Sequence, residues 1–123
     1  MATTRAYTTI EQSRKLAEIL PLESADMYWD YDVQKHEDYP MVMDEQFDDT
    51  CVRAWSLAAL LNIIPKHIKE YNTLRIDIGE KDFSIWYDEI GYGVNTELPD
   101  ITMENPVDAC VETIIKLHGL NLL

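Results

Sequence analysis

Residues 74–87 read Leu74-Arg75-Ile76-Asp77-Ile78-Gly79-Glu80-Lys81-Asp82-Phe83-Ser84-Ile85-Trp86-Tyr87. Apolar side chains occupy every second position on both sides of a polar centre, and this period of two is typical of β-strands. Because the segment from Gly79 to Asp82 consists of glycine and charged residues, we predict a hairpin that turns there. A third strand over residues 92–97, after a turn at residues 88–91, would complete a viable minimal sheet.

The most complete set of helix signals lies near the C-terminus. Asn105 is a typical N-cap, Pro106 suits the first helical position, and Asp108 lies near the positive end of the helix dipole. We expect Gly119 to end this helix and Leu120 to fold back onto its last turn. The apolar side chains form one stripe, which consists of Val107, Cys110, Val111, Ile114 and Leu117.

A first helix is predicted over residues 8–20. Either Thr8 or Thr9 is placed to act as its N-cap, and Glu11 or Gln12 follows three positions later to complete a capping box. This pattern satisfies backbone donors at the start of a helix, so it indicates where the helix begins.

Between this helix and the hairpin, the pattern changes twice. Residues 22–51 show no sustained period; within them we predict a short helical turn over residues 24–31, and residues 41–43 fit either a short strand or an anchored loop. Residues 54–64 are apolar on almost every side, which is typical of a buried helix.

These elements predict an α+β fold formed by a single domain over residues 1–123. In order, it comprises an N-terminal helix, an acidic excursion over residues 23–50, a buried central helix, a two- or three-stranded antiparallel meander and a C-terminal helix. We expect Trp55 and Trp86 in the core, because large aromatic side chains dominate small cores.

The charge of the chain is unevenly distributed. The net charge is −13, and −9 of it lies between Glu23 and Thr50, where ten acids accompany one base, Lys35. Nucleic-acid binding requires a basic footprint, so this acidity argues against direct nucleic-acid binding and against anionic membrane surfaces. The acidity serves either solubility alone or the recognition of a cation, a basic protein or a protein surface that binds nucleic acid.

Targeting and redox signals are weak. The longest apolar run, Leu57 to Leu61, is far too short to span a bilayer, and no apolar signal region follows the first residues. Cys51 and Cys110 do not form a disulfide framework, so we expect buried thiols. The sequence therefore predicts a cytoplasmic protein.

No residue pattern points to a metal, a cofactor or a catalytic centre. A loop that starts at Asp30 begins like an EF-hand, but Lys35 and Met41 replace its glycine and its glutamate. Acids beside Cys51 disfavour its thiolate. Zinc sites need closely paired ligands, and no close pair occurs among His36, Cys51, His67, Cys110 and His118. We assign no catalytic residue, cofactor or metal ligand, and we favour a non-enzymatic protein.

The acidic excursion also carries aromatic residues. Tyr28, Trp29 and Tyr31 fall within four positions, and no regular element turns all three inward, so we expect at least one at the surface or against the acidic loop. Tyr and Trp are favoured interface anchors, and carboxylates steer partners. We predict a protein-binding face formed by Asp26, Tyr28, Trp29, Asp30, Tyr31, Asp32, Glu37 and Asp38. Packing of the rings beneath the loop is the alternative.

Three parts of the chain carry a resemblance to known sequences. They are Thr9-Ile10-Glu11-Gln12-Ser13-Arg14-Lys15-Leu16 with Ser24-Ala25-Asp26-Met27-Tyr28-Trp29, then Ala54-Trp55-Ser56-Leu57-Ala58-Ala59-Leu60-Leu61, then Asn105-Pro106-Val107-Asp108-Ala109-Cys110-Val111-Glu112. On these residues the chain resembles a family of small uncharacterised proteins of gut Bacteroides-type bacteria, their prophages and mobile elements. The resemblance implies an accessory protein in a phage-linked setting, and it implies no activity, cofactor or site residue.

Three functional hypotheses follow. The leading one is a small protein-binding module that uses the acidic and aromatic face, with a partner that is basic or itself binds nucleic acid. The rival is a small-ligand-binding protein or enzyme with a pocket between the meander and the central helix. The third is homo-oligomerisation through an open edge of the meander.

Overall fold

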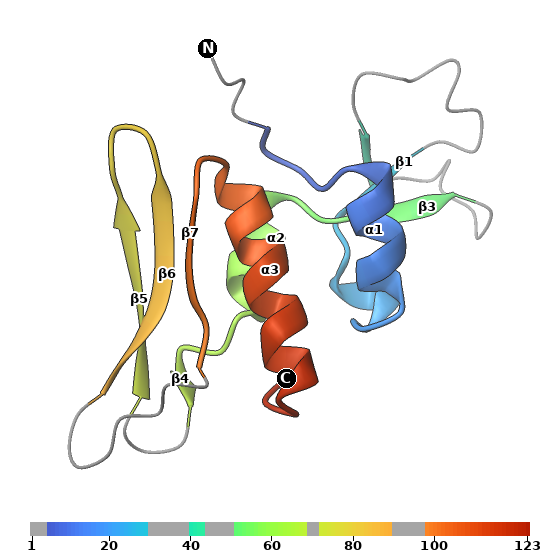
Figure 1. Ribbon diagram of the computed structural model, residues 1–123. Helices are drawn as coiled ribbons and strands as arrows, with labels where there is room; N and C mark the ends of the chain where they lie inside the picture. The colour runs from blue at the N-terminus through green and yellow to red at the C-terminus, as the bar shows by residue number, and fades with distance from the viewer. Residues whose placement is uncertain (1–4, 30–39, 44–50, 69–71, 90–97) are drawn as a thin grey trace.

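The computed structural model describes residues 5–29, 40–43, 51–68, 72–89 and 98–123 (Figure 1). Within these residues the protein is α+β, with helices α1, α2 and α3, a single 3₁₀ turn η1 and two antiparallel sheets. The helical elements are α1 (Ile10–Ala17), η1 (Leu22–Ser24), α2 (Leu57–Ile63) and α3 (Pro106–Gly119).

The seven strands of the described residues form a larger and a smaller sheet. The larger sheet has the order β4-β5-β6-β7, with β4 (His67–Ile68), β5 (Asn72–Ile78), β6 (Phe83–Glu89) and β7 (Asp100–Met103). The smaller sheet has the order β2-β1-β3, with β1 (Met27–Trp29), β2 (Met41–Val42) and β3 (Val52–Ala54).

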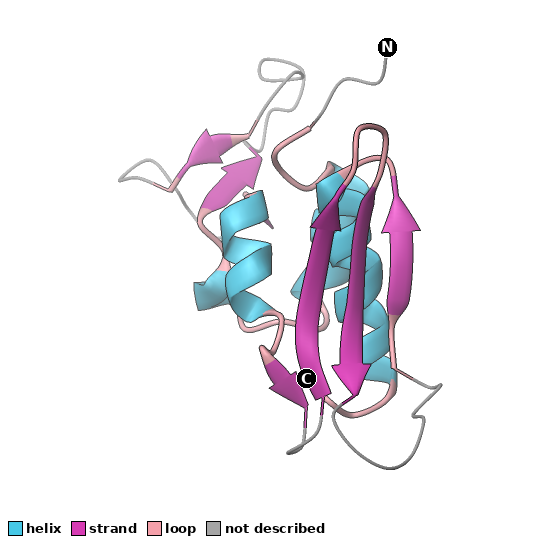
Figure 2. Cartoon of the chain, turned by 90° about the vertical axis from the view of Figure 1, so that its left-hand side faces the viewer, coloured by secondary structure: helices cyan, strands magenta, loops and turns pink. Residues whose placement is uncertain are grey.

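The elements stack in layers from one side of the molecule to the other. Helix α3 lies behind β6 and β7, α2 packs beside α3, and no described helix covers the other face of the larger sheet (Figure 2). Helix α3 contacts β6 and β7, and on its far side it contacts α1, which packs against β3 of the smaller sheet (Figure 1). The helices therefore lie between the two sheets.

The predicted hairpin is confirmed. Strands β5 and β6 pair antiparallel, and the Gly79 N–H donates to the Asp82 carbonyl at 2.9 Å across the turn. Phe83, Ile85 and Tyr87 are buried beneath the helices. The third strand predicted over residues 92–97 lies outside the described residues; the strand that extends the sheet beyond β6 is β7.

The prediction that Trp86 belongs to the core is wrong. Because Phe83, Ile85 and Tyr87 take the helix-covered face, Trp86 lies on the open face, half-buried between Arg75 of β5 and Asp100 of β7. The strict alternation that defined the strand also placed this ring outside.

The C-terminal helix begins as predicted. The Asn105 side chain accepts hydrogen bonds from the backbone N–H groups of Val107 at 2.8 Å and Asp108 at 3.2 Å, and all five residues of the predicted stripe are buried. The end of the helix differs in detail. Gly119 is the last helical residue, but Asn121 takes the left-handed conformation, with φ 59°.

Helices α1 and α2 are shorter than predicted. In α1, Thr9 and Gln12 form the capping box, and the helix ends at Ala17. Helix α2 begins at Leu57 because the preceding residues up to Ala54 form β3, and within α2 only Leu60 is buried. The apolar run of residues 54–64 therefore belongs to a strand, a connection and a helix that buries one side.

The predicted helical turn over residues 24–31 is wrong where the structure describes it. One 3₁₀ turn ends at Ser24, and residues 27–29 form β1, which pairs with β2 and β3. The strand predicted as one option for residues 41–43 is confirmed as β2. Cross-strand pairing with residues far along the chain overrode the local helical signal.

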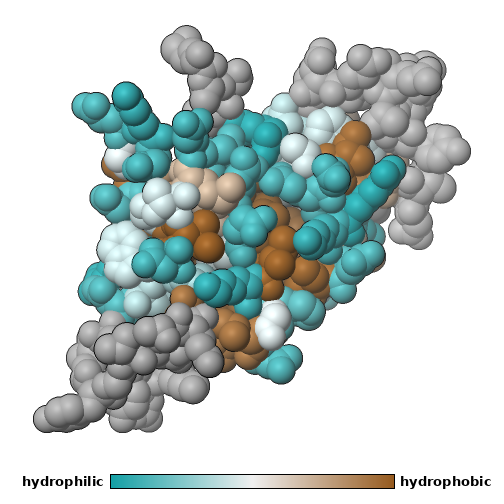
Figure 3. Space-filling view, in the orientation of Figure 1, coloured by the Kyte–Doolittle hydropathy of each residue, from teal (hydrophilic) through white to brown (hydrophobic). Residues whose placement is uncertain are grey.

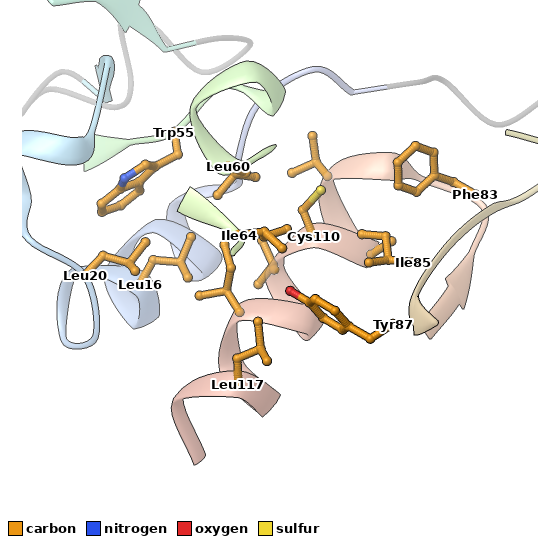
Figure 4. Packing of buried hydrophobic residues seen from close by; sticks show 14 of the residues in the cluster. Leu16, Leu20, Trp55, Leu60, Ile64, Phe83, Ile85, Tyr87, Cys110 and Leu117 are labelled. Atoms are coloured by element: carbon orange, nitrogen blue, oxygen red, sulfur yellow. The ribbon is translucent and has the colours of Figure 1, made fainter. Parts of the chain in front are cut away.

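One hydrophobic core joins the layers (Figure 4). Trp55 is fully buried, as predicted, and its indole Nε1 donates to Ser24 Oγ at 2.9 Å. Around it and along α3 the core continues from α1 to β6 through Leu16, Leu60, Ile64, Ile85, Cys110, Ile114 and Leu117.

Candidate protein-binding site

The described residues include three members of the predicted binding face: Asp26, Tyr28 and Trp29. The other five, Asp30, Tyr31, Asp32, Glu37 and Asp38, lie outside the described residues. The structure therefore gives the geometry of the first part of the acidic excursion.

Asp26 is engaged with another part of the chain. Its Oδ1 accepts a hydrogen bond from the Ser56 backbone N–H at 2.8 Å, and its Oδ2 accepts from the Ser56 hydroxyl. Ser56 is the N-cap of α2, and its Oγ accepts from the Ala59 N–H at 3.2 Å. Asp26 thus supports the start of a helix, and its carboxylate is not an uncommitted group for a partner.

The expectation that Tyr28 and Trp29 present their rings to a partner is corrected. Their exposed fractions are 2% and 5%. They lie in β1, the central strand of the smaller sheet, and successive strand residues point to opposite faces. Burial of both rings means that both faces of β1 are covered.

Trp29 nevertheless contributes to a surface groove. Its indole Nε1 donates to the Thr8 carbonyl at 3.2 Å, and its ring packs edge-to-face against Tyr7, with ring centroids 6.0 Å apart and planes at 77°. Both rings line a hollow of about 400 Å³, which we call the aromatic groove; its lining residues are Arg5, Tyr7, Thr9, Ile10, Glu11 and Trp29.

The charged side chains that line the aromatic groove differ in whether they are already paired within the chain. Arg5 forms an ion pair with Asp108 and donates to the Tyr7 carbonyl at 2.9 Å. Gln12 donates to the same Asp108 carboxylate at 2.7 Å, so Asp108 binds both Arg5 and Gln12. Glu11 is exposed, and within the described ranges its carboxylate forms no ion pair or hydrogen bond. The rim therefore offers one uncommitted negative charge.

Sequence reasoning did not identify Tyr7, Ile10 or Glu11 as site residues. They precede or begin α1, whereas Trp29 follows it by more than ten residues. The contact depends on the bridge between Tyr7 and Ser56, which brings the N-terminal segment beside the smaller sheet. No local pattern encodes that pairing.

Two further hollows lie on the surface of the described residues. One, of about 530 Å³, is lined by Arg14, Ala17, Leu22, Cys51, Val52 and Arg53. The other, of about 390 Å³, lies between α2 and strands β4 and β5, and is lined by Leu61, Lys66, His67, Thr73, Leu74 and Ile76. In the second hollow Lys66 Nζ donates to the Leu61 carbonyl at 2.6 Å, so this cation is held at the end of α2.

From the side of Figure 1, hydrophobic surface appears as patches among hydrophilic side chains (Figure 3).

The nucleophilic and metal-ligating groups show no catalytic arrangement in the part of the chain that the structure describes. Cys51 and Cys110 form no disulfide, and burial raises the pKa of the Cys110 thiol to about 12. No three His, Cys, Asp or Glu side chains among the described residues gather as a metal site. Likewise, none of the described helices is both long and apolar enough to cross a membrane.

No protein-family model, curated protein or solved structure matches this chain.

Proposed function

We propose that this chain is a small, non-enzymatic protein-binding module that recognises a basic surface on another protein. The observation that carries the proposal is the aromatic groove, which has two rings in its lining and the uncommitted Glu11 carboxylate at its rim. The chain passes from Trp29 of the groove directly into Asp30 and the rest of the acidic segment. Apolar contact area and negative charge therefore adjoin along the chain.

The physical roles of the two parts differ. Aromatic and aliphatic side chains in the groove supply contact area, and contacts of this kind change little with salt. The acids between residues 23 and 50 attract a basic surface over longer distances, and that attraction weakens as salt screens it. A nucleic-acid-binding surface of a host or phage protein has the complementary charge, and the family resemblance gives this proposal a phage-linked setting.

The proposal is tested by capture from the lysate of a gut Bacteroides-type strain at low and moderate salt. We expect a stoichiometric partner whose recovery falls as salt rises, followed by measurement of its affinity with the purified chain. Absence of any partner at both salt concentrations would count against the proposal.

A pair of charge variants separates the groove from general acidity. Glu11→Gln and Glu18→Gln each remove one exposed carboxylate from α1 or its C-cap, but only Glu11 lines the groove. We expect Glu11→Gln to weaken binding several-fold and Glu18→Gln to leave it nearly unchanged. Equal effects of the two variants would show that the groove is not the contact.

The alternative function is a small-ligand site between α2 and strands β4 and β5. The hollow of about 390 Å³ at this position favours it, because its lining is mainly apolar and adjoins the core. A screen of small apolar ligands by thermal shift tests it: a concentration-dependent rise in Tm that a substitution of Leu61 removes would support this alternative.

A further inference from the structure

Strand β5 has one edge that is only partly paired. All seven of its residues pair with β6. On the other side, β4 pairs only with Asn72 and Thr73, and the Leu74 N–H forms one more hydrogen bond, to the Lys66 carbonyl. Among the described residues no strand pairs with β5 from Arg75 to Ile78 on that side, and we call this part the β5 edge. Figure 2 shows how short β4 is beside the hairpin.

The backbone groups that point out from the β5 edge follow from two hydrogen bonds. The Leu74 N–H donates to the Lys66 carbonyl at 2.9 Å, on the β4 side, whereas the Gly79 N–H donates to the Asp82 carbonyl, on the β6 side. In an antiparallel strand the direction alternates with every residue. Ile76 and Ile78 therefore direct their N–H and C=O groups outward, while Arg75 and Asp77 bond to β6.

The side chains of this edge are unusual for an open strand. Ile78 is 78% exposed and Ile76 is 39% exposed, on the face that also carries Phe83 and Ile85. The hollow lined by Leu61, Leu74 and Ile76 adjoins them. Natural edge strands are commonly protected by charged side chains, Pro or a bulge. Positions 75–78 hold two charged residues, Asp77 and Arg75, of which Arg75 pairs with Asp88 at 2.9 Å, and they hold no Pro.

Pairing with a second copy of this chain is opposed by geometry and charge. If Ile76 lay opposite Ile76, Ile78 of the second copy would occupy the place of Lys66. If Ile76 lay opposite Ile78, the two Asp77 carboxylates would face each other directly, and each chain has a net charge of −13. The occupant is therefore a different chain with positive charge.

We propose that the β5 edge receives an extended, basic segment of another protein as an added strand. Apolar side chains at every second position of that segment cover Ile76 and Ile78 and reach the adjoining hollow, and basic side chains lie beside Asp77. The following turn carries the exposed Glu80, Lys81 and Asp82, and its net charge of −1 has the same sign as that of Asp77. This inference is independent of the aromatic groove.

The first test uses a short synthetic peptide of alternating isoleucine and lysine, with an isoleucine–glutamate peptide as its matched control. Amide hydrogen exchange is followed by NMR in the free and peptide-bound protein. We expect the Ile76 and Ile78 amides to exchange quickly in the free protein and to become protected by the lysine peptide, while Arg75 and Asp77 are protected in both states. Equal binding of the glutamate peptide, or binding without new protection of Ile76 and Ile78, would overturn the proposal.

Backbone variants test the hydrogen bonds themselves. Ile78→Pro removes an outward N–H without removing a bond to β6, so we expect a folded protein that binds the peptide about tenfold more weakly, the equivalent of about one hydrogen bond. Val42→Pro on β2, another exposed β-branched residue of an edge strand, serves as the control and should leave peptide binding unchanged.

Methylated peptides keep the test decisive if the proline variant fails to fold. N-methyl groups are placed on alternate peptide residues, in one or the other of the two possible patterns. An added strand bonds through only one set of alternate amides, so one pattern should abolish binding and the other should preserve it. Equal behaviour of both patterns would exclude strand addition.

Discussion

The carboxylate of Asp26 accepts two hydrogen bonds from Ser56, one from the backbone N–H at 2.8 Å and one from the hydroxyl. Ser56 caps α2, and the Leu57 N–H donates to the Ala6 carbonyl at 2.9 Å. One acid of the predicted binding face therefore helps to join β1, the N-terminal segment and the central helix.

Removal of this carboxylate should destabilise the fold. We expect Asp26→Ala to lower the free energy of unfolding by about 1–2 kcal/mol, since the start of α2 loses an acceptor. Asp26→Asn should cost less, because the amide oxygen still accepts one hydrogen bond. Urea denaturation measures both, with the exposed Asp100→Asn as the control; equal midpoints for wild type and Asp26→Ala would contradict the assignment.

Truncation of Trp29 is a test of burial. With 5% of its surface exposed and its indole Nε1 bonded to the Thr8 carbonyl, Trp29→Ala should lower the free energy of unfolding by about 3–5 kcal/mol. Trp29→Phe should cost less, because it keeps a ring against Tyr7. If Trp29→Ala unfolds at the same denaturant concentration as wild type, the ring is not part of the packed structure.

Two substitutions at the C-terminal end of α3 should change stability in opposite directions. The Asn121 N–H donates to the His118 carbonyl at 3.0 Å and the Leu122 N–H to the Leu117 carbonyl at 2.9 Å, which is a Schellman motif with Asn121 in the left-handed position. A Cβ at Gly119 would meet nothing within 4 Å. Gly119→Ala should therefore stabilise the protein by about 0.5–1 kcal/mol, and Asn121→Ala should destabilise it by about 1 kcal/mol.

Thermal unfolding of Gly119→Ala and Asn121→Ala shows directly whether each variant is more or less stable than wild type. A lower Tm for Gly119→Ala would mean that Gly119 needs its conformational freedom. Asn121→Gly is the control for backbone conformation, and we expect it to match or exceed the wild-type Tm.

The burial of Cys110 predicts a loss of stability at alkaline pH. Burial raises the pKa of its thiol to about 12, whereas an unfolded thiol ionises near pH 8.5. Above pH 8.5 the unfolded state therefore binds fewer protons than the folded state, and stability falls as pH rises, by at most about 1.4 kcal/mol per pH unit from this group. Below pH 8.5 this group contributes no pH dependence.

Urea denaturation between pH 7 and pH 10 measures this slope, and Cys110→Val should reduce it. The same burial predicts that iodoacetamide does not modify Cys110 until the protein unfolds. Rapid modification of Cys110 in the native protein would contradict the buried position of the thiol.

The elements that local sequence predicted well are those whose signals lie within a few residues. The Thr9–Gln12 capping box, the Asn105 cap and the β5–β6 alternation each depend on neighbours along the chain or across a short turn. Predictions failed where distant contacts compete. The short helical turn gave way to β1 because β3, more than twenty residues away, pairs with it.

The candidate site was less accessible to sequence reasoning than the fold. Composition placed acidic and aromatic residues in one segment, but it did not separate those that bind within the chain, such as Asp26, from those at a surface. Tyr7 and Glu11 were missed, because their position beside Trp29 arises from pairing between the N-terminal segment and residue 56.

The amino-acid sequence by itself determined the α+β class, the hairpin, the two capped helices and the strongly acidic character of the chain. These properties follow from residue periodicity, capping and charge, which act locally or as a sum over residues. Only the tertiary structure decided that Asp26 and Trp29 form contacts within the chain, and that no strand of the described residues pairs with the β5 edge. Each of these depends on which distant strands and loops meet, and such contacts are selected by the collective packing of one core.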